Sequence, residues 1–491
     1  MKPDKQSNIP LYIQIRDHLK ASIASGKYAN GEKLPPVVNL AALMNVTAAT
    51  VRRALQDLTE EGLIYSHVGR GTFVGSAKTT ESETHLRTNR EIHTSLHNSY
   101  VDLVSLSQRP GVIAFTRGIG DPETIEKGIL TRLAARALES GEELFWDHGD
   151  PRGLLCLRKE IAKLYEEQAI EIHPDQILVT SGSQQAIALL AQQAAESGTP
   201  IICETPCYSG VTNALKAFNT ETHTIHRGPF GPNPHEFLGD PSKTMLYLCP
   251  ILHNPTGTNI GDKERIAIST WAKKNGATIL SDEVFRDLHF NENGQKAPLS
   301  FLADPGPDQA IILGSLSKSF ISGLRVGWIV SSKERINTLI NIKKTMDLGC
   351  PPLMQGIARE FLADPDGYRL HREKTRIYYK KLRDITLSAL STYMPKEITW
   401  TKPEGGFQLQ VQLPEGFSSI ELYMRSLENG AAFLPGPLQD QHNGYLNTFR
   451  LCYGSMSANE IDEGIKRIAL SITQYFSESG TSNTQYRLGD F

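Results

Sequence analysis

One lysine lies where its amine could do covalent chemistry. Residues 310–330, AIILGSLSKSFISGLRVGWIV, place Lys318 between two apolar runs. Burying an amine is costly, and burial lowers its pKa and makes it nucleophilic, which suits an amine that forms an imine with an aldehyde cofactor. Ser315 and Ser317 precede the lysine and Arg325 follows it, so a phosphate could be held beside it. The segment predicts a lysine that binds pyridoxal phosphate.

Residues 315–318 also match the motif of a second class of enzyme. Ser-x-x-Lys is also the serine-nucleophile motif of β-lactamases and penicillin-binding proteins, which additionally need Ser-Asp-Asn and Lys-Thr-Gly. Neither tripeptide occurs in the chain. Serines also precede lysines in ordinary loops, so the assignment of Lys318 depends on residues elsewhere.

Composition predicts a multidomain globular protein. The 491 residues are too many for one compact domain, and a net charge of -3 gives no global field for nucleic acid. Residues 1–76 carry a net charge of +3 and the remainder -6, so the N-terminal part is mildly basic. No signal peptide or membrane-length apolar run is found, which predicts a cytoplasmic location and no membrane partner. The six cysteines have no paired C-x-x-C spacing, so we expect reduced thiols and no metal.

The N-terminal 76 residues predict three helices and a hairpin. Apolar residues recur with helical spacing over residues 11–25, a short helix follows around Leu40, and Thr47 suits the N-cap of a longer helix that ends at Gly62. Residues 63–65 and 72–74 alternate like the strands of a hairpin. This order is typical of a winged helix-turn-helix domain, in which the second helix of the pair enters the major groove. A three-helix protein-interaction module is the alternative.

Motifs in this region resemble the DNA-binding domain of GntR-type regulators. They are PLYIQI, GEKLP, NLAALMNVTAATVRRAL, LTEEGLI and GRGTFV, which span most of residues 10–75. The resemblance implies contacts with double-stranded DNA. Val38 and Ala48 stand where the family usually has arginine, and each loss would remove a contact of roughly 1–3 kcal/mol. Arg53 could compensate for these two missing arginines, or it could face solvent. The candidate DNA-binding residues are Thr47, Thr50, Arg52, Arg53, Gly69, Arg70 and Gly71.

A linker and an α/β body follow. Residues 77–110 are polar and predict a tether, residues 111–478 the body, and residues 479–491 a polar tail. Apolar runs separated by amphipathic helical segments predict a largely parallel sheet. These runs cover residues 176–180, 199–204, 244–249, 277–282 and 310–315.

Polar groups follow these strands, where ligands of such sheets bind. A Gly-rich turn that opens a helix can bind an anion, an aromatic ring can cover a cofactor ring, an amide can donate to a phenolate oxygen, and a carboxylate can keep a pyridine nitrogen protonated. The residues in these roles are Ser181, Gly182, Ser183, Tyr208, Asn254 and Asp282.

The body resembles the class I aminotransferases of fold type I over almost its whole length. The resemblance implies that Lys318 forms the internal aldimine, Asp282 pairs with the pyridinium, Asn254 bonds the ring oxygen and Tyr208 stacks on the ring. Arg450, in FRLCYG, matches the arginine that binds a substrate α-carboxylate. The implied phosphate ligands are Ser181, Gly182, Ser183, Ser315 and Arg325.

Two positions depart from the aminotransferase pattern. Phe285 replaces the usual tyrosine, so one hydrogen bond to the ring oxygen is missing. His148 stands where a tyrosine usually reaches the phosphate of the neighbouring subunit. We expect these changes to raise the pKa of the lysine and impair turnover while pyridoxal phosphate binding is retained.

A GntR-like head fused to an aminotransferase-like body resembles the MocR subfamily of bacterial regulators. The resemblance implies a homodimer, with exchange of heads between subunits a possible arrangement. It also implies a transcriptional regulator that senses an amino-group small molecule by aldimine exchange at Lys318. Two alternatives stay open: an active aminotransferase with an autoregulatory head, and a regulator that senses pyridoxal phosphate itself.

Overall fold

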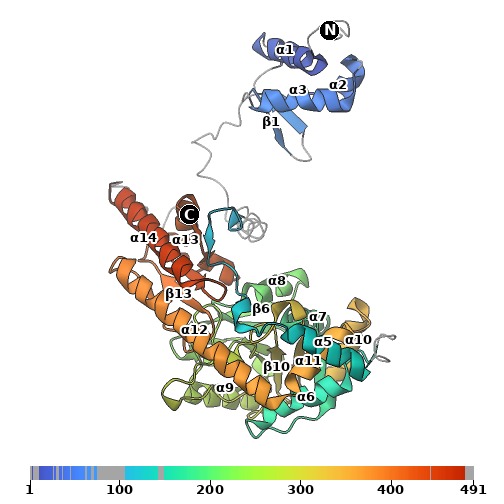
Figure 1. Cartoon of the computed structure of the whole chain (residues 1–491), viewed down its shortest axis with the longest axis vertical. Helices are drawn as coiled ribbons and strands as arrows, with labels where there is room; N and C mark the ends of the chain where they lie inside the picture. The colour runs from blue at the N-terminus through green and yellow to red at the C-terminus, as the bar shows by residue number, and fades with distance from the viewer. Residues whose placement is uncertain are drawn as a thin grey trace. The chain divides into compact units, whose positions relative to one another are not determined.

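The computed structural model divides the chain into two compact units, residues 1–92 and 93–491 (Figure 1). In the first unit it describes residue 3 and residues 10–25, 27–28, 32–35, 37–44, 46–60, 63–67 and 71–74. In the second it describes residues 106–141, 149–442 and 444–481. Most of the linker predicted for residues 77–110 lies outside these ranges. No helix within them is long and apolar enough to cross a membrane.

The first unit has the helices and hairpin that the sequence predicts. Its elements are α1 (Leu11–Ala24), α2 (Val37–Met44), α3 (Ala48–Glu60), β1 (Ile64–His67) and β2 (Gly71–Val74). The antiparallel strands pair Ile64 with Val74, and both side chains join a core supplied by the helices. This is a winged helix-turn-helix domain.

Three candidate DNA-contacting residues of this unit, Thr47, Thr50 and Arg53, have partners within it. The Thr47 hydroxyl accepts a hydrogen bond from the Thr50 amide at 3.3 Å and lies 2.8 Å from the Thr50 hydroxyl, which confirms Thr47 as the N-cap of α3. The exposed Arg53 side chain lies 3.5 Å from the Asp57 carboxylate and 5.8 Å from the ring centre of Tyr12. Arg53 therefore extends along its own helix toward α1.

An eight-stranded sheet is the centre of the second unit, with the order β4-β11-β10-β9-β8-β5-β6-β7. Strands β10, β9, β8, β5 and β6 are parallel, whereas β11 runs antiparallel between β10 and β4, and β7 is antiparallel to β6. The prediction of a largely parallel sheet is confirmed. The bounds are β4 (Ile177–Thr180), β5 (Ile201–Thr205), β6 (Thr222–Gly228), β7 (Gly231–Pro232), β8 (Met245–Leu248), β9 (Thr278–Asp282), β10 (Ala310–Ser315) and β11 (Gly327–Val330).

Helices bury both faces of this sheet, which is why its strands read as continuous apolar runs. One face packs against α5 (Ile129–Gly141), α6 (Leu155–Glu166), α9 (Asp262–Asn275) and α11 (Pro352–Leu362). The other packs against α7 (Ser183–Ser197), α8 (Ser209–Ala217) and α10 (Lys333–Met346). Because neither face is open, polar side chains collect at the ends of the strands.

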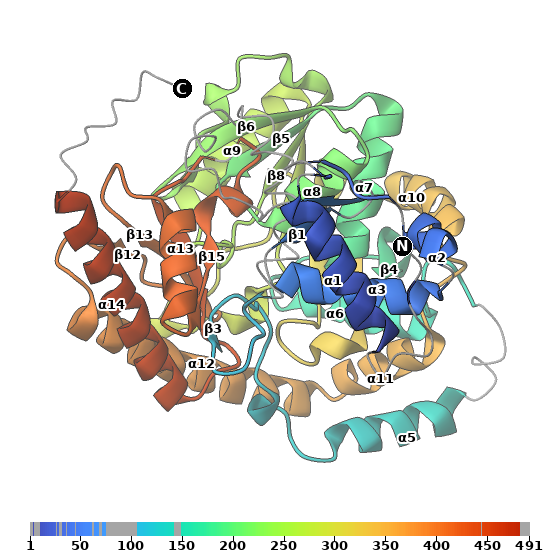
Figure 2. The ribbon, with the colours of Figure 1, turned by 90° about the horizontal axis from the view of Figure 1, so that it is seen from above.

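A second, antiparallel sheet packs into a separate core, and the sequence did not reveal it. Its order is β12-β13-β16-β15, and the long helices α12 and α14 lie together beside it (Figure 2). The short strand β3 (Ile113–Ala114) pairs with β14 (Ala431–Ala432), which ties the start of the second unit to this core. The other bounds are β12 (Thr399–Trp400), β13 (Gln408–Gln412), β15 (Leu434–Pro435), β16 (Thr448–Cys452), α12 (Pro365–Tyr393), α13 (Ser419–Glu428) and α14 (Ala458–Thr481).

Replacing Thr47 with valine should lower the stability of the first unit by about 1 kcal/mol, because the side chain keeps its shape but loses the capping oxygen. Calorimetry of the full chain should show a lower melting temperature for the transition of the first unit and an unchanged transition of the second. Thr47→Ser, which retains the hydroxyl, is the control. Equal melting temperatures for the valine and serine variants would contradict the capping role.

Candidate functional site

Five strand ends bring the candidate residues to one edge of the large sheet. Asp282 is the last residue of β9 and pairs in register with Leu313 of β10, whose strand leads into Lys318. The segments after β4, β5 and β8 carry the other predicted groups, and Arg450 comes from β16 of the second sheet. Carboxyl ends of parallel strands are where α/β sheets bind ligands. The cluster therefore has the position that the sequence predicts.

Lys318 is a partly buried amine with one direct hydrogen bond. Its Nζ donates to the carbonyl oxygen of Gly118 at 2.6 Å and lies 5.6 Å from the ring centre of Phe285. Loss of solvent around the amine lowers its pKa to about 8, helped by the positive charge of Arg450 and opposed by Cys452 and Asp282. A substantial neutral fraction near physiological pH makes the amine a competent nucleophile.

Asp282 is a buried carboxyl without a cation bonded to it among the described residues. It accepts hydrogen bonds from the Tyr247 hydroxyl at 3.1 Å and from the Val284 amide at 3.3 Å. Burial raises its pKa to about 6, although both hydrogen bonds favour the charged form. A protonated ring nitrogen placed opposite this carboxylate would stabilise the charge that burial disfavours.

Arg325 and a tight turn form a cradle for an anion. Gly182 has φ +81° and caps the N-terminus of α7, and a Cβ there would collide with the guanidinium of Arg325. Arg325 is exposed and donates to the Ser181 carbonyl at 3.1 Å and to the Ser317 hydroxyl at 3.4 Å. A helix N-terminus beside an arginine suits a phosphate.

Of the two serines before the lysine, Ser317 faces the cradle more directly than Ser315. The Ser315 hydroxyl donates to the carbonyl of Val326 at 3.2 Å and accepts from the Ser317 amide at 3.0 Å, so it holds the loop. The Ser317 hydroxyl accepts a bond from Arg325. Ser317, which the sequence placed near a phosphate together with Ser315, is thus the better candidate phosphate ligand of the two.

Arg450 and Asn254 are bonded to each other. Nη1 of Arg450 donates to Oδ1 of Asn254 at 2.9 Å, and Nη2 donates to the Thr116 carbonyl at 2.9 Å. Its Nε is buried without a hydrogen-bond partner among the described residues. The Tyr208 hydroxyl donates to Gln184 at 3.2 Å. The guanidinium therefore lies in the cluster and retains a donor for a carboxylate.

Some predicted residues lie where the structure gives no test. His148, Gly69 and Arg70 are outside the described residues, as is the side chain of Arg52. Phe285 is described, and its ring packs against Phe407 with centres 5.5 Å apart. Among the described residues no group of three metal-ligating side chains is found.

The residues present fit pyridoxal phosphate. Among the described residues the buried carboxyl has no bonded cation, the arginine cradle lies at a helix N-terminus, and the partly buried amine of Lys318 interacts electrostatically with both Asp282 and Arg325. Asp282 would hold the ring nitrogen, Asn254 and Tyr208 the ring, and Arg325 the phosphate. Tyr247, Gly118 and Ser317 support this cluster. The sequence had already placed Ser317 near a phosphate. It missed Tyr247 and Gly118, of which only Tyr247, within a buried strand that ends at the site, carried a signal that the sequence could have shown.

Comparison with known proteins places the two units in families. The model for class I and II aminotransferases matches residues 118–468, and the model for the GntR family of bacterial regulatory proteins matches residues 11–74. The chain is 31% identical over 374 residues to a 2-aminoadipate transaminase of Thermus thermophilus, covering 76% of this chain and 92% of that protein. The chain belongs to the class I and II aminotransferase family and carries a GntR-type helix-turn-helix domain.

Both units together have full-length relatives. The HTH-type transcriptional regulator YdfD of Bacillus subtilis is 27% identical over 482 residues, which cover 96% of this chain and 98% of that protein. The crystal structure of the α-aminoadipate aminotransferase LysN from Thermus thermophilus, in complex with N-(5'-phosphopyridoxyl)-L-leucine, matches with a TM-score of 0.70 and 28% identity over 77% of this chain and 95% of that one. This combination of units is the MocR-like architecture.

Asp282→Asn should stabilise the cofactor-free protein and weaken pyridoxal phosphate binding. The folded pKa of about 6 exceeds the ordinary value of 3.8, so the stability from the protonated carboxyl is present below about pH 4 and is lost as pH rises through 6. An amide stays neutral, so at pH 8 the variant should gain about 3 kcal/mol in denaturant unfolding. Pyridoxal phosphate titration should show weaker binding, and lower stability with unchanged binding would contradict the assignment.

Proposed function

We propose that the protein is a DNA-binding transcriptional regulator whose body binds pyridoxal phosphate and reads an amino-group effector that carries a carboxylate. The observation that supports this most strongly is the clustering of Lys318, Asp282 and Arg450 in a chain that begins with a winged helix-turn-helix unit. The similarity to full-length HTH-type regulators supports the same function.

Each residue of the cluster has a separate task. Pyridoxal phosphate supplies an aldehyde that condenses reversibly with primary amines. Lys318 provides the resident amine, Arg325 and the N-terminus of α7 bind the phosphate, and Asp282 keeps the ring nitrogen protonated. An effector amine competes with Nζ of Lys318, while Arg450 binds the carboxylate of the effector.

The hydrogen bonds of Lys318 and Arg450 suggest how effector binding could change the structure outside the cluster. Both side chains donate to carbonyl groups of one short segment, Nζ to Gly118 and Nη2 to Thr116. This segment follows β3, near the start of the second unit. An effector that displaces Nζ of Lys318 from the cofactor and is bound by Arg450 changes the hydrogen bonding of both side chains to this segment, and its differential affinity for the two arrangements biases the body.

Two heads would read DNA together. We propose a homodimer, in which paired heads bind two half-sites and exchange of heads between subunits is one arrangement. Affinity for DNA then depends steeply on salt, because phosphate neutralisation releases counterions.

An active aminotransferase is the second candidate. The Lys318, Asp282 and Arg450 set is intact, and a transaminase is 31% identical to the body. Phe285 opposes efficient turnover, because its ring has no hydroxyl to offer the ring oxygen. A regulator that senses pyridoxal phosphate itself is the third candidate, but it leaves the carboxylate-binding arrangement of Arg450 without a purpose.

Spectroscopy with candidate amino acids separates the first two functions. We expect the absorbance of the cofactor-loaded protein to shift once on adding the effector, with no steady formation of keto acid when a second keto acid is supplied. Arg450→Lys should weaken the effector response by tenfold or more, since a bidentate fork is lost. Sustained turnover by the native protein would favour the enzyme. Lys318→Ala should abolish the imine absorbance, and its persistence would overturn the site.

The rate of cofactor uptake should follow the titration of Lys318. Burial lowers its pKa to about 8, so the neutral amine predominates above that pH. Stopped-flow mixing of cofactor-free protein with pyridoxal phosphate should therefore give a rate that rises from pH 6.5, is half-maximal near pH 8 and levels off about one pH unit higher. A rate that continues to rise toward pH 10 would indicate an unperturbed lysine.

A further inference from the structure

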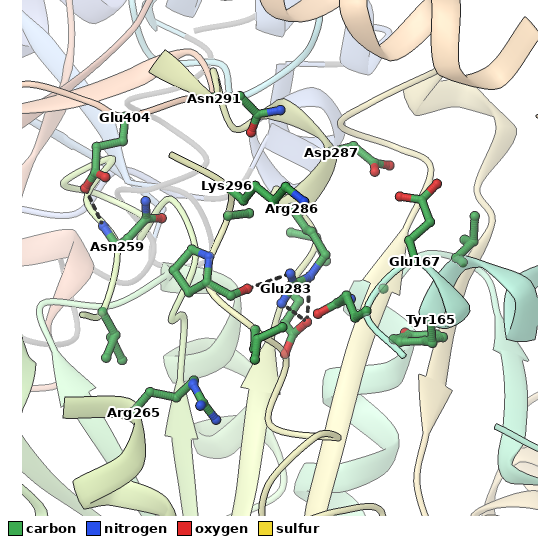
Figure 3. Close-up of a pocket in the computed structure, with 18 of the residues that line it drawn as sticks. Tyr165, Glu167, Asn259, Arg265, Glu283, Arg286, Asp287, Asn291, Lys296 and Glu404 are labelled. Carbon is green, nitrogen blue, oxygen red and sulfur yellow. Dashed lines mark hydrogen bonds and ion pairs between the residues drawn. The ribbon is translucent and has the colours of Figure 1, made fainter. Parts of the chain in front are cut away.

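We propose a second ligand site, in a groove at the N-terminus of α9, that binds a small molecule with one carboxylate and an apolar body. The groove has a volume of about 1380 Å³ and is formed by the loops after β8 and β9, the end of α6 and the first turns of α9 and α12. Figure 3 shows Arg265, Arg286, Glu283, Asn259 and Glu404 around it.

This groove is distinct from the cluster around the lysine. Its wall includes Ser315 of β10, so the two sites share one strand end. Its lining contains none of Lys318, Asn254, Asp282 and Arg450, however. A ligand here would leave the proposed cofactor and effector positions free.

Arg265 is a buried guanidinium with unused donors. The residue is 7% exposed, and its Nε and Nη1 are buried without a hydrogen-bond partner among the described residues. Asp262 is 4.0 Å from Nε, too far for a hydrogen bond, and the Asp262 side chain is 77% exposed. Buried donors without acceptors are costly, so an oxyanion at this position would be bound strongly.

A neighbouring arginine shows the contrast. Arg286 donates to Glu283 Oε2 from Nε at 3.0 Å and from Nη2 at 2.8 Å, and to the Pro298 carbonyl from Nη1 at 2.7 Å (Figure 3). Each of the three nitrogens of this guanidinium therefore donates a hydrogen bond within the fold. Figure 3 shows Arg265 apart from that network.

The first turn of α9 adds to the attraction for an anion. The helix begins at Asp262 after Gly261 and has 14 residues, so the positive end of its dipole lies beside Arg265, where the carboxylates of Asp262 and Glu264 in the same turn offset part of it. The helix terminus alone would not define a site. The unbonded buried guanidinium beside it does.

The charge and the rim of the groove select the ligand class. Five cationic and six acidic residues line it, so no net positive field favours a polyanion. A single carboxylate held by the Arg265 fork suits this balance. Phe230, Ile266 and Leu299 line the groove and are 68%, 52% and 44% exposed, which suits an apolar ligand body.

Calorimetric titration with phenylacetate, and separately with inorganic phosphate, tests this site in the full chain, both cofactor-free and loaded with pyridoxal phosphate. We expect phenylacetate to bind in both forms and phosphate to bind more weakly. Arg265→Gln should weaken phenylacetate binding at least tenfold, and Phe230→Ala several-fold. Lys263→Gln, which removes an exposed charge from the same helix, is the matched control and should change little.

A second variant, Arg265→Lys, tests the site if Arg265→Gln fails to fold. It keeps the charge and loses the planar fork of the guanidinium, so it should bind phenylacetate several-fold more weakly. Arg450→Lys should leave this binding intact. Loss of binding in Arg450→Lys with retention in Arg265→Gln would place the carboxylate beside Lys318 and overturn the proposal. Equal binding of phosphate and phenylacetate, unaffected by Phe230→Ala, would mean an adventitious ion only. Absence of binding would also overturn it.

Discussion

The body depends on an amine and a carboxyl group that burial brings toward neutrality. Loss of solvent lowers the pKa of Lys318 to about 8 and raises that of Asp282 to about 6. The two residues follow adjacent parallel strands, β10 and β9, because both faces of the sheet are covered by helices and the strand ends are the places left for polar groups. Burying these two groups therefore lowers the free energy of unfolding, and a cofactor that pairs with the carboxyl and reacts with the amine would offset part of this destabilisation.

One short segment connects this cluster to the rest of the chain. Strand β3 pairs with β14 of the second core, and the backbone just after it accepts bonds from Lys318 at Gly118 and from Arg450 at Thr116. The amine and the guanidinium come from different sheets, so the segment is held from both cores at once. In the proposed function, a ligand that displaces Nζ of Lys318 and is bound by Arg450 would change how these cores are joined, so that its binding would have structural consequences beyond the cluster.

The sequence predicted the large sheet because its strands are short apolar runs buried on both sides, and each run ends in a recognisable polar group. The second sheet escaped notice because two of its strands have only two residues, and because Gln408, Gln410 and Arg450 interrupt the apolar pattern of the others. The Arg450–Asn254 bond joins residues far apart in sequence, which local patterns cannot show. Likewise, spacing could not distinguish the loop-holding role of Ser315 from the contact of Ser317 with Arg325.

Phe285 affects cofactor binding and catalytic turnover differently. Its ring packs against Phe407 and lies 5.6 Å from Nζ of Lys318, so the position is filled by an apolar side chain rather than left open to a water that could replace a missing hydroxyl. A cofactor can still be held, because Asp282, Arg325 and the amine are independent of this side chain. Repeated proton transfers at the ring need finer tuning of charge than reversible binding does. Removing one donor beside the lysine therefore costs a catalyst more than it costs a sensor, which supports the proposed sensor function over the aminotransferase.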